Sequence, residues 1–388
     1  MRRLSGFLIS LLILITGSLN PQLYINRDSV VSDAVLPGAR WLDTDGNPIQ
    51  AHGGQVQRMP VPAEDGETRV LYVWVGENKN SGHTGNPVSV YTSEDLLRWE
   101  YRGDVLRPLQ SVEDIDTDPY FRELYGSLSD AEKEHVYACI GADKVIERPK
   151  MLYNEKNDNY VLWFHNDFST EKNSYLYDVG MAGLAVSDSP FGPFRFIDRY
   201  RLSECPPDQI DCFPLSKGEA RDMNLFQDDD GTAYIVYTSE NNKTLYISRL
   251  NEDYTGLSGT EYGMDYIRIF PGAMREAPVL MKHEGRYYLM SSSTTGWMSN
   301  QARVWSAGSI FGRWRNDGNP CVGKGASVTF DTQSTTLFQT ASGQWVYGGD
   351  RWDQNDLADS RYIWLPVDFQ GDRLQITWQT SWLPDASE

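Results

Sequence analysis

A short hairpin that opens on a polar residue recurs four times along the chain and limits the possible folds. In each copy the polar residue precedes a short strand, a turn containing Gly, Asn or Asp follows, and an aromatic-rich strand returns. The polar residues that open the copies are Glu147, Asp222, Glu276 and Gln333. With Arg69–Glu77 counted as a further strand, module starts fall near residues 70, 148, 222, 277 and 334. Five modules of about four strands predict an all-β, five-bladed β-propeller that forms a single catalytic domain.

Composition supports an all-β fold and excludes some partners. The chain contains 22 Tyr and 12 Trp, and aromatic residues favour strands. We interpret residues 104–145, which are acidic and partly helical by pattern, as an insertion. A formal net charge of −19 without a basic cluster excludes nucleic acid as a partner.

The N-terminus has the pattern of an export signal. Two arginines precede a short apolar run and then small residues, which predicts a secretory signal peptide over residues 1–20. We expect a linker over residues 21–37 and the propeller over 38–388. The protein is therefore expected to be secreted or periplasmic, with no stable membrane insertion after signal cleavage. We also expect it to be a monomer.

The four cysteines and the acidic runs give limited information about cross-links and metals. Cys205 and Cys212 could close a small loop in an oxidising compartment, and Cys139 with Cys321 is a second candidate pair. No spacing of Cys and His predicts zinc. The run Asp228–Gly231 predicts a hairpin turn, because no Glu follows at the spacing of a calcium loop.

The polar strand heads, taken in order, resemble a known family. They read His52-Gly53-Gly54, Glu147-Arg148-Pro149-Lys150, Arg221-Asp222-Met223-Asn224, Arg275-Glu276-Ala277-Pro278 and Gln333-Ser334-Thr335. This succession resembles glycoside hydrolase family 43, and within it the branch that holds exo-β-1,3-galactanases; the likeness runs from about Trp41 to Trp382. The resemblance implies a five-bladed propeller that hydrolyses β-1,3-galactan from chain ends, with a polysaccharide or oligosaccharide substrate. It implies no required cofactor and leaves a calcium ion in the axial channel open.

The resemblance also assigns roles that agree with the chemistry of inverting hydrolysis. Such a reaction needs a protonated acid at the leaving oxygen and a group that activates water on the opposite face. Glu276 resembles the general acid, Glu147 resembles the residue that orients this acid and raises its pKa, and Arg148 would contact the substrate or a carboxylate. Most of the family has an Asp base in the first blade, whereas here His52-Gly53-Gly54 contains no acid.

Resemblance to the galactanase branch places Gln333 in the water-activating role. A neutral amide is a poor proton acceptor, so it would position the water or act through its imidic tautomer. Glu77 and Asp222 are the rival carboxylates, although we expect both to bind sugar hydroxyls.

Several residues have alternative interpretations. Tyr177, Thr295, Trp297 and Trp352 are candidates for the pocket wall, although tryptophans often belong to the core. Two alternatives to the galactanase remain: a related arabinofuranosidase or galactofuranosidase, and a propeller that binds carbohydrate without catalysis.

Overall fold

The computed structural model describes residues 29–30, 33–62, 65–213 and 217–384. The predicted signal peptide, residues 1–20, lies outside the described residues. Part of the predicted linker is described and is packed against the propeller, as set out below.

Five antiparallel blades make up the molecule, as the sequence predicted. Blade 1 contains β3 (His52–Pro62), β4 (Thr68–Glu77), β5 (Val88–Ser93) and β6 (Glu100–Leu106). Blade 2 contains β7 (Val145–Asn154), β8 (Asn159–Asp167), β9 (Met181–Ser187) and β10 (Arg195–Tyr200). Blade 3 contains β11 (Arg221–Gln227), β12 (Ala233–Ser239), β13 (Thr244–Arg249) and β14 (Tyr266–Ile269). Blade 4 contains β15 (Arg275–His283), β16 (Arg286–Ser293), β17 (Arg303–Ala307) and β18 (Arg315–Gly318). Blade 5 contains β20 (Gln333–Gln339), β21 (Trp345–Arg351), β22 (Arg361–Gln370) and β23 (Arg373–Thr377), with β19 (Cys321–Val322) added at its edge.

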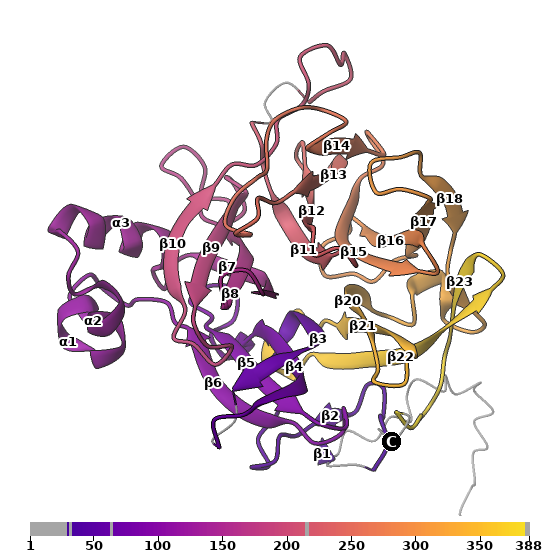
Figure 1. Ribbon diagram of the computed structural model, residues 1–388, viewed down its shortest axis with the longest axis horizontal. Helices are drawn as coiled ribbons and strands as arrows, with labels where there is room; N and C mark the ends of the chain where they lie inside the picture. The colour runs from indigo at the N-terminus through magenta and orange to yellow at the C-terminus, as the bar shows by residue number, and fades with distance from the viewer. Residues whose placement is uncertain (1–28, 31–32, 63–64, 214–216, 385–388) are drawn as a thin grey trace, which may run out of the picture.

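The first strand of each blade faces the axis. β3, β7, β11, β15 and β20 each contact the first strand of the next blade and form a ring around the centre (Figure 1). Blade 1 therefore begins at His52 and not near residue 70, because the strand that the sequence indicated there, β4, is the second of its blade. The polar strand heads consequently meet at the axis.

Alternation along the strands builds five hydrophobic clusters, one between each pair of neighbouring blades. Ile235 on β12 packs toward blade 2, and its neighbour Val236 packs toward blade 4. Met151 and Leu152 on β7 divide in the same way between the clusters toward blade 1 and blade 3. Successive side chains of a strand point to opposite faces, so each blade supplies apolar surface to both neighbours.

The ring closes where blade 5 meets blade 1, through an aromatic cluster. Trp74, Tyr362 and Trp364 lie within it, and the rings of Trp74 are 4.6 Å from Tyr362 and 4.7 Å from Trp364. Each such pair adds about 0.5–1.5 kcal/mol beyond burial. Val35 and Trp382 exchange backbone hydrogen bonds of 2.9 and 3.1 Å, so the end of the predicted linker fastens the C-terminal segment. A small parallel sheet, β1 (Ser29–Val30) with β2 (Arg40–Trp41), lies nearby.

The remaining elements are short. The insertion between blades 1 and 2 is helical as expected, with α1 (Asp114–Thr117), α2 (Pro119–Tyr125) and α3 (Asp130–Ile140) on the outside of blade 2 (Figure 1). Single 3₁₀ turns are η2 (Lys79–Ser81), η3 (Ala326–Val328) and η4 (Leu357–Asp359). Asp228–Gly231 forms the β11–β12 turn, as predicted. Among the described residues, no helix has the length and apolar character needed to cross a bilayer.

One of the two suggested cysteine pairs forms. Cys205 and Cys212 are joined by a disulfide. Cys139 and Cys321 are free, which contradicts the second suggested pair. The reason is spatial, since Cys139 packs between blades 1 and 2 and Cys321 between blades 4 and 5.

Candidate active site

A β-bulge near the start of every innermost strand directs side chains toward the axis. The register shifts between His52 and Gln55 on β3 and at equivalent positions on the other four strands. In four blades the bulge contains a left-handed residue: Gly53, Arg148, Asp222 and Ala277. For a residue other than glycine this conformation costs about 1–3 kcal/mol, and such strain is concentrated at functional sites. The repeated bulge therefore explains why the predicted residues converge.

A central cavity of ≈ 230 Å³ lies over the strand heads. Nine of the ten predicted site residues line it: Glu77, Glu147, Arg148, Tyr177, Asp222, Glu276, Trp297, Gln333 and Trp352. Thr295 does not line it and is exposed. Its hydroxyl lies in the β16–β17 loop, where it donates to the Met298 carbonyl at 2.6 Å and accepts from Asn300 at 2.7 Å.

The environment of the Glu276 carboxyl favours its protonated form. The residue is 8% exposed. Burial, followed by the neighbouring Asp222 carboxylate, raises the pKa of Glu276 to about 8, although Arg148 and Arg275 oppose the shift. Asp222 is held close because its Oδ2 accepts from the Ala277 backbone N–H at 3.2 Å. A carboxyl that keeps its proton near neutral pH is suited to general-acid chemistry.

The Gln333 amide has protein partners at both of its ends. Nε2 donates to Glu276 Oε1 at 3.0 Å and to Ser292 Oγ at 3.2 Å. Oε1 accepts from Trp352 Nε1 at 2.9 Å and from Arg148 Nη2. An amide has two donors and two lone pairs, so this set uses its full hydrogen-bonding capacity. In this arrangement Gln333 orients the Glu276 carboxyl. To hold a water molecule, the Gln333 amide would have to give up one of these four hydrogen bonds.

Glu147 belongs to a buried charge network that lowers its pKa and so favours its ionised form. Its Oε1 accepts from Lys79 Nζ at 3.1 Å and from the Tyr177 hydroxyl at 2.9 Å. Burial opposes ionisation, but Lys79 and His165 together hold the pKa of Glu147 below its usual range. Because Lys79 and Tyr177 bind its charge, Glu147 is a weaker influence on Glu276 than Asp222. In this structure the carboxylate that raises the pKa of Glu276 is Asp222. The modulating role predicted for Glu147 stays a prediction.

Glu77 packs directly against Gly53 in the first strand head. A Cβ added at Gly53 would lie 2.1 Å from Glu77 Oε1, so only glycine fits beside this carboxylate. Glu77 Oε1 accepts from the Arg148 backbone N–H at 2.8 Å, and Oε2 lies 2.5 Å from Lys79 Nζ. The His52 ring is fully buried against Tyr362, at 4.8 Å, and therefore plays a structural part.

His165 and Lys79 are site residues that sequence reasoning missed. His165 is 2% exposed; its Nε2 is hydrogen-bonded to Asp167 at 3.1 Å. Its Nδ1 has no hydrogen-bond partner and lies 3.9 Å from both Glu147 and Asp222. His165 stands opposite Glu147 in the β7–β8 register, so the hairpin pairing itself was a signal that could have identified it. Lys79 lies in η2, outside the repeated pattern, and only the folded chain reveals it.

Aromatic rings form one wall of the cavity. Trp297 and Trp352 pack edge to face with centroids 5.3 Å apart. The Arg148 guanidinium lies 5.9 Å from the Trp352 ring and 3.8 Å from Asp222. Flat apolar rings next to charged donors and acceptors suit a sugar, which has apolar faces and polar edges.

A larger depression of ≈ 470 Å³ lies between blades 1 and 5, and includes Arg40, Tyr101 and Asp359 in its lining. Its Asp359 carboxylate is paired with Arg40 and Arg361. The central cavity holds the buried Glu276, whose pKa is raised, and is therefore the better candidate active site.

Comparison with known proteins gives consistent matches. The model of the family described as "Glycosyl hydrolases family 43" matches residues 149–351, just over half of the chain. A solved family 43 β-1,3-galactosidase with galactodeoxynojirimycin is 33% identical and has a TM-score of 0.71; the likeness covers 90% of this chain and 100% of that one. An exo-β-1,3-galactanase from Phanerochaete chrysosporium, solved with β-1,3-galactotriose, is 30% identical with a TM-score of 0.70, covering 91% of this chain and 68% of that one.

A curated relative has a different named activity. A β-D-galactofuranosidase of Aspergillus niger is 35% identical over 155 residues. These residues are 39% of this chain and 37% of the Aspergillus protein, so the match spans little more than a third of that curated relative.

Proposed function

Because the chain belongs to glycosyl hydrolases family 43, we propose that it removes galactose from the ends of β-1,3-linked galactan chains. The family and the enzyme class were predicted from the strand heads, and the matches confirm both. The observation that carries the proposal is the buried Glu276, with a pKa of about 8, inside a carbohydrate-sized cavity. The cavity of ≈ 230 Å³ is smaller than the about 300–1,000 Å³ of sites for drug-sized ligands, which suits a terminal sugar.

Glu276 is the general acid of the proposed reaction. Its proton passes to the glycosidic oxygen as the bond to the anomeric carbon breaks, and the leaving chain departs as an alcohol. Asp222 and burial keep this proton in place until the substrate arrives. The Glu276 carboxylate that remains is then stabilised by Arg148 and Arg275, the two cations that oppose its raised pKa.

Gln333 holds the attacking water in the proposed mechanism. The acid and base of inverting enzymes stand about 6.5–9.5 Å apart, whereas Gln333 Nε2 lies 3.0 Å from Glu276. We therefore propose that the amide leaves Glu276 when a sugar enters and turns its oxygen toward the water. Attack then inverts the anomeric carbon: the hydroxide part of the water bonds to this carbon, and the amide oxygen takes the water proton while an Nε2 proton passes to solvent. Proton exchange with solvent afterwards returns the imidic form to the amide and reprotonates Glu276.

Asp222 is the alternative base. Its side chain is 18% exposed and can meet a water directly. Glu77 is less suited, because its two oxygens are already bound by the Arg148 N–H and by Lys79.

The Aspergillus match supports a second candidate function. That relative is named a β-D-galactofuranosidase, so hydrolysis of galactofuranosides is the alternative reaction. Both candidates place a galactose-derived sugar in the cavity and differ in the ring form that it accepts.

The setting of the reaction is part of the proposal. The Cys205–Cys212 disulfide and the N-terminal signal pattern support secretion or a periplasmic location. We propose that the protein acts as a monomer and needs no cofactor, because side chains supply both the proton and the contacts to the sugar.

Product analysis on defined oligosaccharides tests the proposal. Purified protein is incubated with β-1,3-galactotriose, β-1,4-galactobiose and an aryl β-galactofuranoside. We expect galactose and galactobiose as the first products from the triose, and ¹H NMR should detect the α-anomer of galactose first. Preferential release from the galactofuranoside would instead establish the second candidate.

The Glu276→Gln variant is the control, with a loss of about 10²–10⁴-fold expected on the triose. Binding without turnover on every substrate, by correctly folded protein, would refute both enzymatic candidates and leave the carbohydrate-binding propeller.

A further inference from the structure

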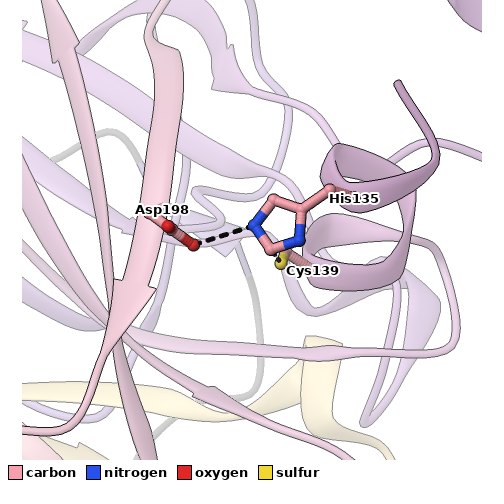
Figure 2. A group of neighbouring side chains, drawn as sticks. All are labelled: His135, Cys139 and Asp198. Atoms are coloured by element: carbon pink, nitrogen blue, oxygen red, sulfur yellow. Dashed lines mark hydrogen bonds and ion pairs between the residues drawn. The ribbon is translucent and has the colours of Figure 1, made fainter. Parts of the chain in front are cut away.

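A cluster of three different ligand-type side chains lies far from the catalytic cavity, where α3 meets blade 2. His135 and Cys139 are four residues apart on α3 and so project from the same face of the helix. Asp198 lies opposite them on β10, the outer strand of blade 2. Figure 2 shows the three side chains pointing toward one another, from the helix on one side and the strand on the other.

The distances between their ligand atoms are close to those of a metal site. His135 Nε2 lies 2.9 Å from Asp198 Oδ1 and 3.7 Å from Cys139 Sγ, and all three atoms lie within 4.8 Å of one another. Tetrahedral zinc with bonds of about 2.0–2.3 Å separates its ligand atoms by about 3.3–3.6 Å. Movements of about 1 Å would bring these three atoms to such a geometry.

We propose that His135, Cys139 and Asp198 bind Zn²⁺ and fasten the helical insertion to blade 2. The sequence predicted no zinc, because its ligands do not follow a familiar Cys/His spacing and the third ligand comes from a different element. One nitrogen, one sulfur and one oxygen suit this borderline ion, whereas Ca²⁺ and Mg²⁺ prefer oxygen ligands alone. With three protein ligands, water completes the tetrahedron.

The surroundings of the three side chains determine how an ion reaches them and which proton it must displace. The His135 side chain is 54% exposed, so an ion can enter from solvent, whereas Cys139 is fully buried. Burial raises the pKa of the Cys139 thiol to about 11, and bound metal would displace that proton. Asp198 also accepts the Arg199 backbone N–H at 2.8 Å, which fixes the carboxylate before the ion arrives.

The site would affect the strand that carries Glu147. α3 ends at Ile140, and β7 begins at Val145. The Cys139 carbonyl accepts from Asn166 Nδ2 at 3.0 Å, and the same amide donates to the Val145 carbonyl at 3.0 Å. An ion at Cys139 would therefore stabilise the entry to β7, and its effect should be seen in stability before activity.

Titration of the tag-free, full-length protein tests the site. After removal of metal by chelation, ZnCl₂, CaCl₂ and MgCl₂ are added in separate calorimetric titrations. We expect one equivalent of Zn²⁺ to bind and no matching signal from Ca²⁺ or Mg²⁺. Saturating Zn²⁺ should raise Tm by at least about 2 °C, because the ion binds only the folded state. Co²⁺ should give the near-ultraviolet absorption of a cobalt–thiolate bond.

Matched variants locate the ion. Cys139→Ser and Asp198→Asn should each weaken Zn²⁺ binding at least about tenfold. Losing a residue that only hydrogen-bonds to a metal ligand already lowers metal affinity about tenfold or more, and losing the ligand itself should lower it at least as much. Cys321→Ser removes the other buried thiol and His283→Gln another imidazole, and both should leave binding unchanged. Asp198→Asn keeps the shape of its side chain, so it reports on binding even where Cys139→Ser fails to fold.

Two results would overturn the proposal. The first is the absence of stoichiometric Zn²⁺ binding by folded protein. The second is binding that Asp198→Asn and Cys139→Ser leave unchanged, because the ion would then lie elsewhere.

Discussion

Replacing the acid Glu276 by Gln should remove activity and stabilise the protein at alkaline pH. In the unfolded chain this carboxyl ionises at its usual pKa of 4.5, and in the folded protein at about 8. Between these values the unfolded state has lost the proton and the folded state still holds it. The contribution of Glu276 to stability is therefore fully present below pH 4.5 and is lost as pH rises through 8.

The size of the effect follows from the shift. A pKa difference of about 3.5 corresponds to about 5 kcal/mol at 1.36 kcal/mol per pKa unit, and about 3.5 kcal/mol of it falls between pH 5 and pH 8. Gln cannot ionise, so the variant lacks this pH dependence. The free energy of unfolding of Glu276→Gln, minus that of the wild type, should rise by about 3.5 kcal/mol over that interval.

Urea unfolding, followed by tryptophan fluorescence at several pH values and checked for reversibility, measures the difference. Glu240→Gln is a control of opposite sign. Burial opposes the ionisation of Glu240, but hydrogen bonds from Arg268 and Tyr246 lower its pKa, so its contribution is lost as pH falls. A difference for Glu276→Gln that stays constant within about 1 kcal/mol from pH 5 to pH 8 would refute the reasoning, because the buried carboxyl would then be ionised in the folded protein.

Three further predictions concern the neighbours of the acid and the disulfide. Asp222→Asn should shift the alkaline limb of the pH–rate profile to lower pH, because Glu276 loses the carboxylate that raises its pKa. Glu147→Gln should leave this limb in place. The opposite pattern in the kcat/KM profiles would return the modulating role to Glu147. Gln333→Ala should abolish turnover yet spare disaccharide binding, and Gln333→Glu should keep part of the activity; an active Gln333→Ala with an inactive Asp222→Ala would make Asp222 the base. Cys205→Ser should lower the free energy of unfolding by about 2 kcal/mol, measured by urea denaturation under non-reducing conditions, because the disulfide closes only a short loop. Reduction of the wild-type protein should lower its free energy of unfolding by the same amount, which would attribute the loss in the variant to the missing cross-link.

The sequence by itself determined the repeat, and with it the fold. A polar residue, a short strand, a turn and an aromatic return strand, repeated at blade intervals, can bury their apolar faces only against copies of themselves. Glu147, Asp222, Glu276 and Gln333 were identifiable because they occupy the same position in each repeat. Local pattern was sufficient for this, since strand alternation and turn chemistry depend on near neighbours.

The first blade was located less well, because its repeat differs from the others. Its innermost strand begins with His52, Gly53 and Gly54, which include no acid or amide, so the module start was assigned to the second strand. Only the fold explains the glycine: Glu77 from the neighbouring strand fills the space of its missing side chain.

Tertiary structure alone decided how the charges are shared. Lys79, from a 3₁₀ turn outside the repeat, binds Glu77 and Glu147, and this leaves Asp222 to raise the pKa of Glu276. Such couplings depend on distances of a few ångströms between residues that lie far apart along the chain. Electrostatic energy falls with distance and grows with burial, and neither quantity can be read from a linear pattern.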